Sequence, residues 1–412
     1  METEEFDLKI QLTNEYLRTG GVQQILDVVL LQDIIDFNPK QINTFTPRLK
    51  AFMNLILKTH LIPPLVIKDN MSEYKSFLQK SLFFDQIQID TEEQFDVIYS
   101  KLKEKGNFLF RGQREAKWRL YSNLQRNWID NKIYNQQNSY EEFLKKLVNN
   151  GAEMYTSTIQ KILDKFHIDT VNSISVLGYL QHHSCPTPLL DWTYKFQNAL
   201  FFGLDKLIPN NGPTEIGNYF SIYYIDEESL GGGGMRKLME ETLDEVGEEY
   251  LEKAISLVAK NEGQKQKMKK HFMGRKFFDN ERIPGAGLIS YITEIDKLIN
   301  FPLEYFSDKD AQNGIIFSLN NSLNIQNQKG VFTWNADPIK PLEVMGTEQY
   351  FFENVGAKAD EYRFCGCYNI NKDLSNYITK KLAKEGIIHD YIYPTKDIDT
   401  WEVFVKSQSA SS

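Results

Sequence analysis

The stretch NFLFRGQREAKWRL, residues 107–120, begins as a buried strand and ends on a charged side chain. Its apolar run predicts a strand over residues 107–111, which would ordinarily end in a turn of Gly, Asn or Asp. Here Arg111 ends it, directly before Gly112. A guanidinium is costly to bury unless an anion meets it. Two interpretations follow for Arg111: an internal ion pair with a carboxylate such as Asp191, or contact with a ligand.

A second stretch, LQHHSCPTPLLDWTYKFQNALFFG at residues 180–203, turns the chain and returns it to the core. Its two prolines prevent a regular helix at that point. Thr193 is placed to cap a helix over residues 194–204. Because a helix N-terminus favours an anion, we expect this N-terminus and Arg111 to contribute to one anion-binding pocket.

Composition limits the class of protein. The chain has 412 residues, a net charge of −9, 41% hydrophobic residues and three cysteines. The acidic balance argues against a protein that mainly coats nucleic acid. The few, odd-numbered cysteines do not suggest a disulfide framework, and the acidic N-terminus lacks a signal-peptide pattern. No apolar run approaches the roughly 20 residues that span a bilayer, so we expect a cytoplasmic protein without a membrane contact.

The chain divides into several regions. We expect a helical N-terminal unit of unknown role over residues 1–92, an α+β domain over 93–405 and a disordered tail over 406–412. A charged helical insertion is expected at about 231–300, because a run of four glycines precedes it and its charge is dense. The core sheet is predicted to be mixed or antiparallel, with strands at 107–111, 218–225, 315–319, 330–334 and 362–369.

Four ordered blocks of the sequence resemble the FRG domain family, named for its Phe-Arg-Gly motif. The blocks are residues 107–126, residues 180–203, NIQNQKGVFTW at 324–334 and EGIIHDYIYPTKDI at 385–398. Two positions depart from the family pattern, since Pro188 and Asn324 stand where the family usually has arginine. These departures put any phosphate contact at those two positions in doubt. The family resemblance implies a bacterial or phage-defence setting, in which the chain would act as a toxin-like effector.

A more distant resemblance is to ADP-ribosyltransferase-like folds, and it implies an α+β core of that kind. These folds place an Arg-Gly or His-Gly pair at an early strand end, a polar residue before an Ala/Phe-rich helix, and a Glu or Gln on a late strand. The resemblance implies NAD as the substrate and no metal. It implies cofactor-binding roles for Arg111, Gly112, Gln113 and Thr193. It implies catalytic roles for His182, Asp191 and Gln328.

Structural explanations compete with each of these roles. Gln113 and Gln181 are also interpretable as core amides that satisfy backbone groups, His182 as a non-catalytic histidine, and Gln328 as an amide that caps a strand turn. Two hypotheses therefore stand. The first is an enzyme that transfers ADP-ribose from NAD to a protein or nucleic-acid acceptor, or hydrolyses NAD, under control of a regulatory partner such as an antitoxin. The second is a non-catalytic module that senses a nucleotide or nucleic acid through the Arg111 pocket.

Overall fold

The computed structural model describes eleven segments of the chain. These are residues 72–135, 139–166, 171–208, 214–227, 256, 261–272, 293–299, 301–308, 317–354, 362–395 and 398–408. Most of the expected N-terminal unit, the expected tail beyond residue 408 and most of the expected insertion lie outside them.

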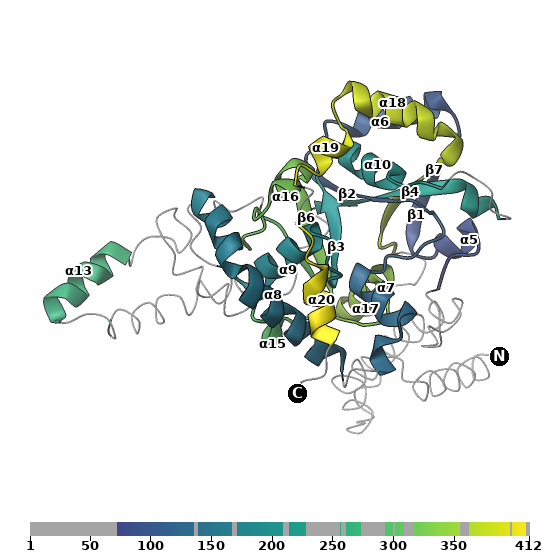
Figure 1. Cartoon of the computed structure of the whole chain (residues 1–412). Coiled ribbons are helices and arrows are strands. Elements are labelled where there is room, and N and C mark those ends of the chain that lie inside the picture. The colour runs from purple at the N-terminus through teal and green to yellow at the C-terminus, as the bar shows by residue number, and fades with distance from the viewer. Residues whose placement is uncertain are drawn as a thin grey trace, which may run out of the picture.

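The described part is an α+β fold built on one seven-stranded mixed sheet (Figure 1). The strands lie in the order β1-β7-β4-β2-β3-β6-β5, in which β1 and β7 are parallel and all other pairs are antiparallel. The expectation of a mixed sheet is thus confirmed. The strands are β1 (Phe84–Ile89), β2 (Phe108–Gln113), β3 (Leu189–Thr193), β4 (Tyr219–Asp226), β5 (Leu303–Phe306), β6 (Gly330–Asn335) and β7 (Cys365–Asn371).

Four of the five predicted strands are found, as β2, β4, β6 and β7. The fifth, predicted over residues 315–319, is wrong for the residues that the structure describes. Residues 317–319 carry no strand. The Asp308 carboxylate instead accepts hydrogen bonds from the backbone N–H groups of Phe317 and Leu319, at 2.7 and 2.6 Å. Ser318 between them has a left-handed φ of 59°, which does not fit a ladder. Three strands were not predicted, and one of these, β1, joins the sheet although it precedes the expected boundary at residue 93.

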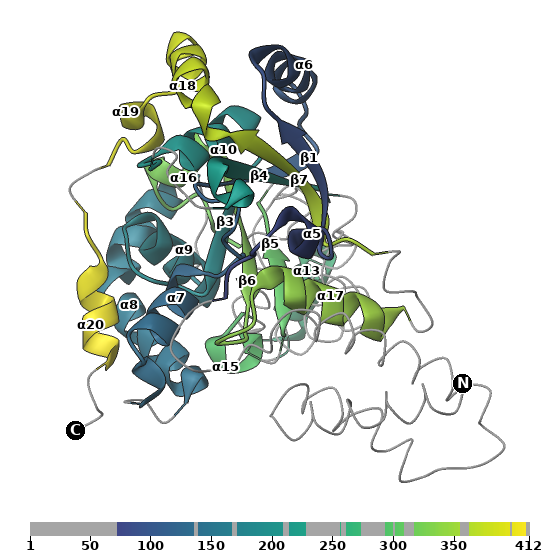
Figure 2. The same cartoon turned by 90° about the vertical axis from the view of Figure 1, so that its right-hand side faces the viewer.

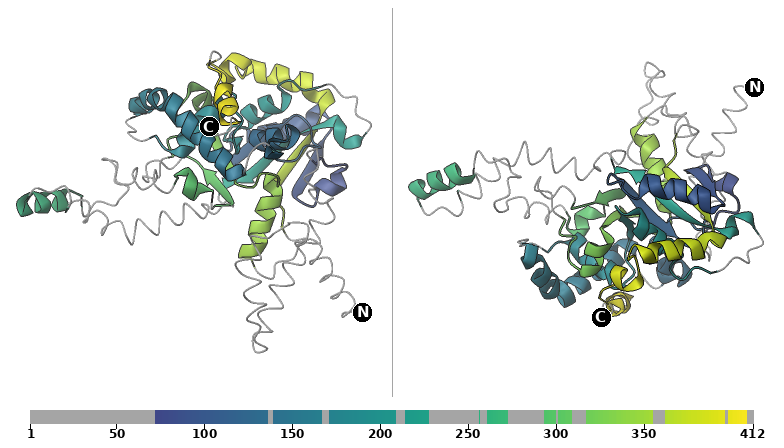
Figure 3. Two further views of the ribbon diagram at one scale, coloured as in Figure 1. Left: turned by 60° about the horizontal axis from the view of Figure 1, so that its bottom comes forward. Right: turned by 90° about the horizontal axis from the view of Figure 1, so that it is seen from above.

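Most helices of the described part lie around the sheet. The helices are α5 (Phe77–Lys80), α6 (Glu92–Leu102), α7 (Asn123–Asp130), α8 (Tyr140–Leu163), α9 (Ser173–His182), α10 (Phe196–Leu204), α13 (Glu262–Phe272), α15 (Ile295–Leu298), α16 (Leu323–Gln328), α17 (Leu342–Glu353), α18 (Ser375–Lys384), α19 (His389–Ile392) and α20 (Trp401–Gln408). Helix α13 lies apart from the rest of the described fold (Figure 3). Among the described residues, no helix is both long and apolar enough to cross a membrane.

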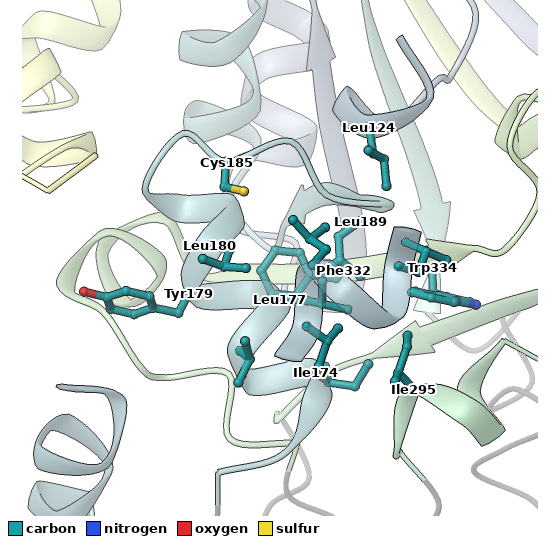
Figure 4. Close-up of a cluster of buried hydrophobic side chains, with 14 of the residues drawn as sticks. Leu124, Ile174, Leu177, Tyr179, Leu180, Cys185, Leu189, Ile295, Phe332 and Trp334 are labelled. Atoms are coloured by element: carbon teal, nitrogen blue, oxygen red, sulfur yellow. The ribbon is translucent and has the colours of Figure 1, made fainter. Parts of the chain in front are cut away.

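Side chains of each strand alternate between the two faces of the sheet, and different helices pack on each face. On the face that bears Phe110, here the α10 face, two groups of helices pack. Helices α6, α10 and α18 cover β7, β4 and β2, whereas α7, α8, α9 and α20 cover β3 and β6. The second group forms the largest cluster of buried apolar side chains, centred on Phe332 and Trp334 (Figure 4). The opposite face, here the α17 face, is covered by α5, α17 and residues 115–121; Figure 2 shows α17 and α8 on opposite sides of β6.

The sheet parts between β2 and β3. Strand β2 pairs with β4 along its whole length, and β3 pairs with β6 along its whole length. Between β2 and β3 only Phe110 and Thr193 are paired. In Figure 1 the two strands run in clearly different directions from this point. The divergence leaves a gap next to Arg111 and Asp191, where the two helix groups of the α10 face also meet.

Candidate functional site

A pocket of about 600 Å³ opens at this gap. Its walls come from the end of β2, the end of α9, β3, the end of α10, α16 and the C-terminal segment that contains α19. The lining residues are Arg111, Gly112, Gln181, His182, His183, Ser184, Asp191, Phe202, Asp205, Lys206, Asn324, Gln328, His389, Tyr393, Thr395 and Ile398. The structure therefore brings five of the seven predicted site residues to one pocket: Arg111, Gly112, His182, Asp191 and Gln328.

Arg111 bridges the two diverging strands through their backbone rather than through an ion pair. Its Nη1 donates to the main-chain carbonyl of Asp191 at 2.7 Å. Its Nε is buried and has no hydrogen-bond partner in the described part of the chain. Burial lowers the pKa of Arg111, and the nearby charge of Asp191 opposes that shift. No ion pair joins Arg111 to a carboxylate among the described residues, so the guanidinium keeps donors for a ligand.

The Asp191 carboxylate is held by a chain of side-chain hydrogen bonds. Gln181 Nε2 donates to Asp191 Oδ2 at 2.6 Å, and the Thr187 hydroxyl donates to Gln181 Oε1 at 2.6 Å. Gln181 thus orients an acid, which differs from the interpretation of this residue as an amide that satisfies backbone groups. A positioned carboxylate and a guanidinium lie at the same gap in the sheet.

His182 ends α9 and presents an imidazole to the pocket. Its Nε2 is buried without a hydrogen-bond partner in the described structure, and its ring lies 5.4 Å from that of Phe332. Burial lowers the pKa of His182 to about 4. The imidazole is therefore neutral at pH 7 and can donate or accept one hydrogen bond from a ligand.

We expect His182 to make the fold sensitive to acid. Its pKa is about 6.5 when unfolded and about 4 when folded, so the unfolded chain takes up the proton first as the pH falls. The stabilisation is complete above pH 6.5 and is lost as the pH falls toward 4. Between pH 7 and 4.5 the wild type should lose about 2 kcal/mol more unfolding free energy than His182→Asn. Urea unfolding at both pH values measures this, and identical losses would contradict it.

Gln328 lies at the end of a helix, not on a late strand as the resemblance implied. It closes α16, directly before β6 begins. Its Nε2 donates to the carbonyl of Ile392 in α19 at 3.1 Å. Nearby, Asn324 Nδ2 donates to the His182 carbonyl, and Asn324 Oδ1 accepts from the Thr395 hydroxyl at 2.7 Å. The side-chain amides of Gln328 and Asn324 thus join the C-terminal segment to the other walls of the pocket.

Thr193 does not cap α10 and does not line the pocket. The helix begins at Phe196 with Lys195 as its N-cap residue, and no side chain caps it. The Thr193 hydroxyl, which is 1% exposed, donates to the carbonyl of Gln328 at 2.5 Å and accepts from the Lys195 N–H. The prediction of an N-cap is wrong, because this hydroxyl binds the backbone carbonyl at the end of α16 instead.

Gln113 also lies away from the pocket. Its side chain is buried, and Nε2 donates to the carbonyl of Arg119 at 3.4 Å. This position fits the interpretation of Gln113 as a core amide that satisfies a backbone group, rather than as a contact to a cofactor. Gly112 does line the pocket, but its lack of a side chain has a packing cause: a Cβ there would lie 1.9 Å from the Ala199 carbonyl oxygen.

An aromatic wall was missed in the sequence. Phe202 of α10 and His389 and Tyr393 of the C-terminal segment line one side of the pocket. The Tyr393 ring lies 5.0 Å from that of His389 and 6.4 Å from that of Phe202. The sequence shows FFG at residues 201–203 and HDYIY at residues 389–393, but no pattern near either motif indicates that the two lie together in the fold. The described residues contain no group of three or more His, Cys, Asp or Glu side chains that could hold a metal ion.

Comparison with known proteins identifies one family. Residues 106–211 match the family model of the FRG domain. This span contains β2, β3 and α10, and with them Arg111, His182 and Asp191, whereas Gln328 and the aromatic residues of α19 fall outside it. No curated protein and no solved structure matches the chain.

Proposed function

We propose that the pocket of this FRG segment binds NAD and that the chain cleaves the bond between nicotinamide and ribose. The ADP-ribose would pass to a protein or nucleic-acid acceptor or to water. The observation that carries the proposal is that Arg111, which has no ion-pair partner in the described structure, and the carboxylate of Asp191 line the same pocket.

The proposed binding mode follows from two kinds of lining group and from the volume of the pocket. Arg111 offers a planar fork of donors that suits a phosphate of the dinucleotide. The rings of Phe202 and Tyr393 offer apolar faces for a base or for nicotinamide. The volume of about 600 Å³ lies within the usual range for a small-molecule site.

The proposed chemistry uses the carboxylate of Asp191. The C1′–N bond breaks heterolytically, its electron pair leaves with nicotinamide, and the ribose becomes an oxocarbenium-like cation. A fixed carboxylate stabilises such a cation more than an amide does. Water or the acceptor then attacks C1′ and loses a proton. We assign the electrostatic role to Asp191, because Gln181 already orients it.

Two further residues have supporting roles in this proposal. The Nε2 of Gln328 donates one of its two N–H groups to the Ile392 carbonyl, and its Oε1 would accept a hydrogen bond from the ribose 2′-hydroxyl. The neutral imidazole of His182 would bind a second hydroxyl through Nε2. With a macromolecular acceptor, the activity would suit a toxin-like or antiviral defence effector that a partner such as an antitoxin restrains.

A second candidate is a non-catalytic nucleotide sensor. The observation that favours it is the amide of Gln328, which stands where the resemblance would allow a carboxylate and which is engaged with α19. A sensor would bind NAD or another nucleotide through Arg111 without consuming it.

The test is incubation of the full chain with NAD, alone and with protein, RNA or DNA, followed by mass analysis and by calorimetry of NAD binding. We expect Asp191→Asn to keep NAD binding and to lower the cleavage rate by about 10²–10³-fold. Arg111→Ala should abolish binding while costing the fold only about 1 kcal/mol, the value of one hydrogen bond. Arg363→Ala, which removes an arginine outside the pocket, is the control and should behave as the wild type.

The outcomes separate the two candidates. NAD binding that depends on Arg111 without any cleavage would select the sensor. Neither binding nor cleavage by the wild type would contradict both. A large loss of stability in Arg111→Ala would favour a structural role, in which this arginine holds β2 and β3 together, over contact with a ligand.

A further inference from the structure

A cluster of three arginines extends from the pocket across the end of β2 to the start of α7. Its members are Arg111, Arg114 and Arg126. Neighbouring basic residues do form ion pairs: Lys117 pairs with Glu73, and Arg119 pairs with Glu343. None of the three arginines forms an ion pair with a described residue.

Trp118 fixes two of these arginines in place. The Cζ atoms of Arg114 and Arg126 lie 5.7 and 5.2 Å from the centre of the same indole ring. Arg126 Nε also donates to the carbonyl of Tyr121 at 3.2 Å. A guanidinium held against a ring by a cation–π contact still has N–H donors on its edge. Arg114 makes no hydrogen bond with a described residue, so its donors remain available.

The positive charges of the three arginines repel one another. Burial lowers the pKa of Arg126 to about 10, and the charges of Arg111 and Arg114 add to this shift. The chain as a whole is acidic, with a net charge of −9, and the charges of Asp191 and Asp130 offset part of the effect on Arg111 and Arg126. Holding like charges together costs free energy, and a bound anion would recover it.

We propose that Arg114 and Arg126, positioned by Trp118, form a phosphate-binding site at the rim of the pocket. Planar guanidinium groups bind phosphate oxygens in pairs, which favours phosphate over a spherical anion. The site adjoins the pocket through Arg111, which belongs to both. The phosphate would come from a nucleic acid or from a free phosphorylated compound, and binding there does not require NAD cleavage.

The test measures binding of two probes to the full chain without NAD. One is a short fluorescent single-stranded RNA, followed by anisotropy across a range of salt concentrations. The other is inorganic pyrophosphate, followed by calorimetry and by competition with the RNA. The variant is Arg114→Gln/Arg126→Gln. The matched control is Lys161→Gln/Lys165→Gln, which removes the same charge from exposed positions at the end of α8.

We expect the arginine double variant to bind the probes at least about tenfold more weakly and the lysine variant to bind as the wild type. If the source is nucleic acid, the RNA binds more tightly than pyrophosphate and the variant has a shallower salt dependence. If the source is a free compound, pyrophosphate binds and displaces the RNA. Equal binding by wild type and arginine variant, or equal loss in the lysine variant, overturns the site. NAD cleavage is measured separately on Asp191→Asn, so the two proposals can fail independently.

Discussion

Replacing Gly112 with alanine should lower the free energy of unfolding by more than about 3 kcal/mol, beyond the usual cost of an added methyl group. The new Cβ would lie 1.9 Å from the carbonyl oxygen of Ala199 and 2.5 Å from the backbone N of Gly203. Both obstacles are backbone atoms of α10, so no side chain can rotate away, and the helix has to move off the sheet. Urea and thermal unfolding of Gly112→Ala measure the loss.

The same substitution should also disturb the pocket. Helix α10 carries Phe202 and leads to Lys206, and both line the cavity. Gly106→Ala is the matched control, because no atom lies within 4 Å of its added Cβ. A Gly112→Ala protein as stable as Gly106→Ala would show that α10 can shift at little cost, and would contradict the packing explanation of this glycine.

The second large effect is expected for Glu343→Gln on the α17 face. Glu343 is fully buried, accepts hydrogen bonds from the Tyr74 hydroxyl at 2.5 Å and the Leu120 N–H at 3.2 Å, and lies 3.7 Å from Arg119 Nε. Arg119 is 1% exposed, and its other close neighbours include the rings of Tyr74 and Phe83. Among the described residues, Glu343 is the only carboxylate that forms an ion pair with Arg119, so its removal leaves a buried cation without that partner. We expect a loss of about 3–5 kcal/mol in unfolding free energy.

Two further variants test this interpretation. Glu153→Gln breaks an exposed ion pair with Lys406 and should leave the free energy of unfolding close to that of the wild type. The double variant Glu343→Gln/Arg119→Met should recover part of the loss, because removing both charges leaves no uncompensated ion. A double variant less stable than Glu343→Gln would mean that Arg119 stabilises the fold by packing rather than by charge balance.

This buried pair also supports the proposed phosphate site. Residues 115–121 run from the arginine-bearing end of β2 to α7, and Glu343 holds them at Arg119 and Leu120. Loss of the pair would free the segment that carries Trp118. Stability should therefore be measured before any change in phosphate binding is interpreted.

Local sequence patterns were sufficient for part of the fold and part of the pocket. The apolar runs that became β2, β4, β6 and β7 were visible because strand residues repeat with a period of two and end at recognisable breaks. The anomaly of Arg111 after such a run predicted a pocket there, and Arg111 does line the described pocket, although β2 continues past it to Gln113. The roles predicted for His182 and Asp191 came from the resemblance to ADP-ribosyltransferase-like folds, and the structure places both residues at one pocket.

Tertiary structure decided the rest. Whether Arg111 met the carboxylate of Asp191 or its carbonyl depended on how β2 and β3 lie relative to each other, and the two strands pair only at Phe110 and Thr193. Thr193 was available as a helix cap by sequence, but its hydroxyl bound a carbonyl 135 positions away. The aromatic wall and the Arg114–Trp118–Arg126 cluster are likewise assembled from separate elements. Propensity and periodicity describe neighbours along the chain, whereas these choices are made by contacts between elements distant in sequence.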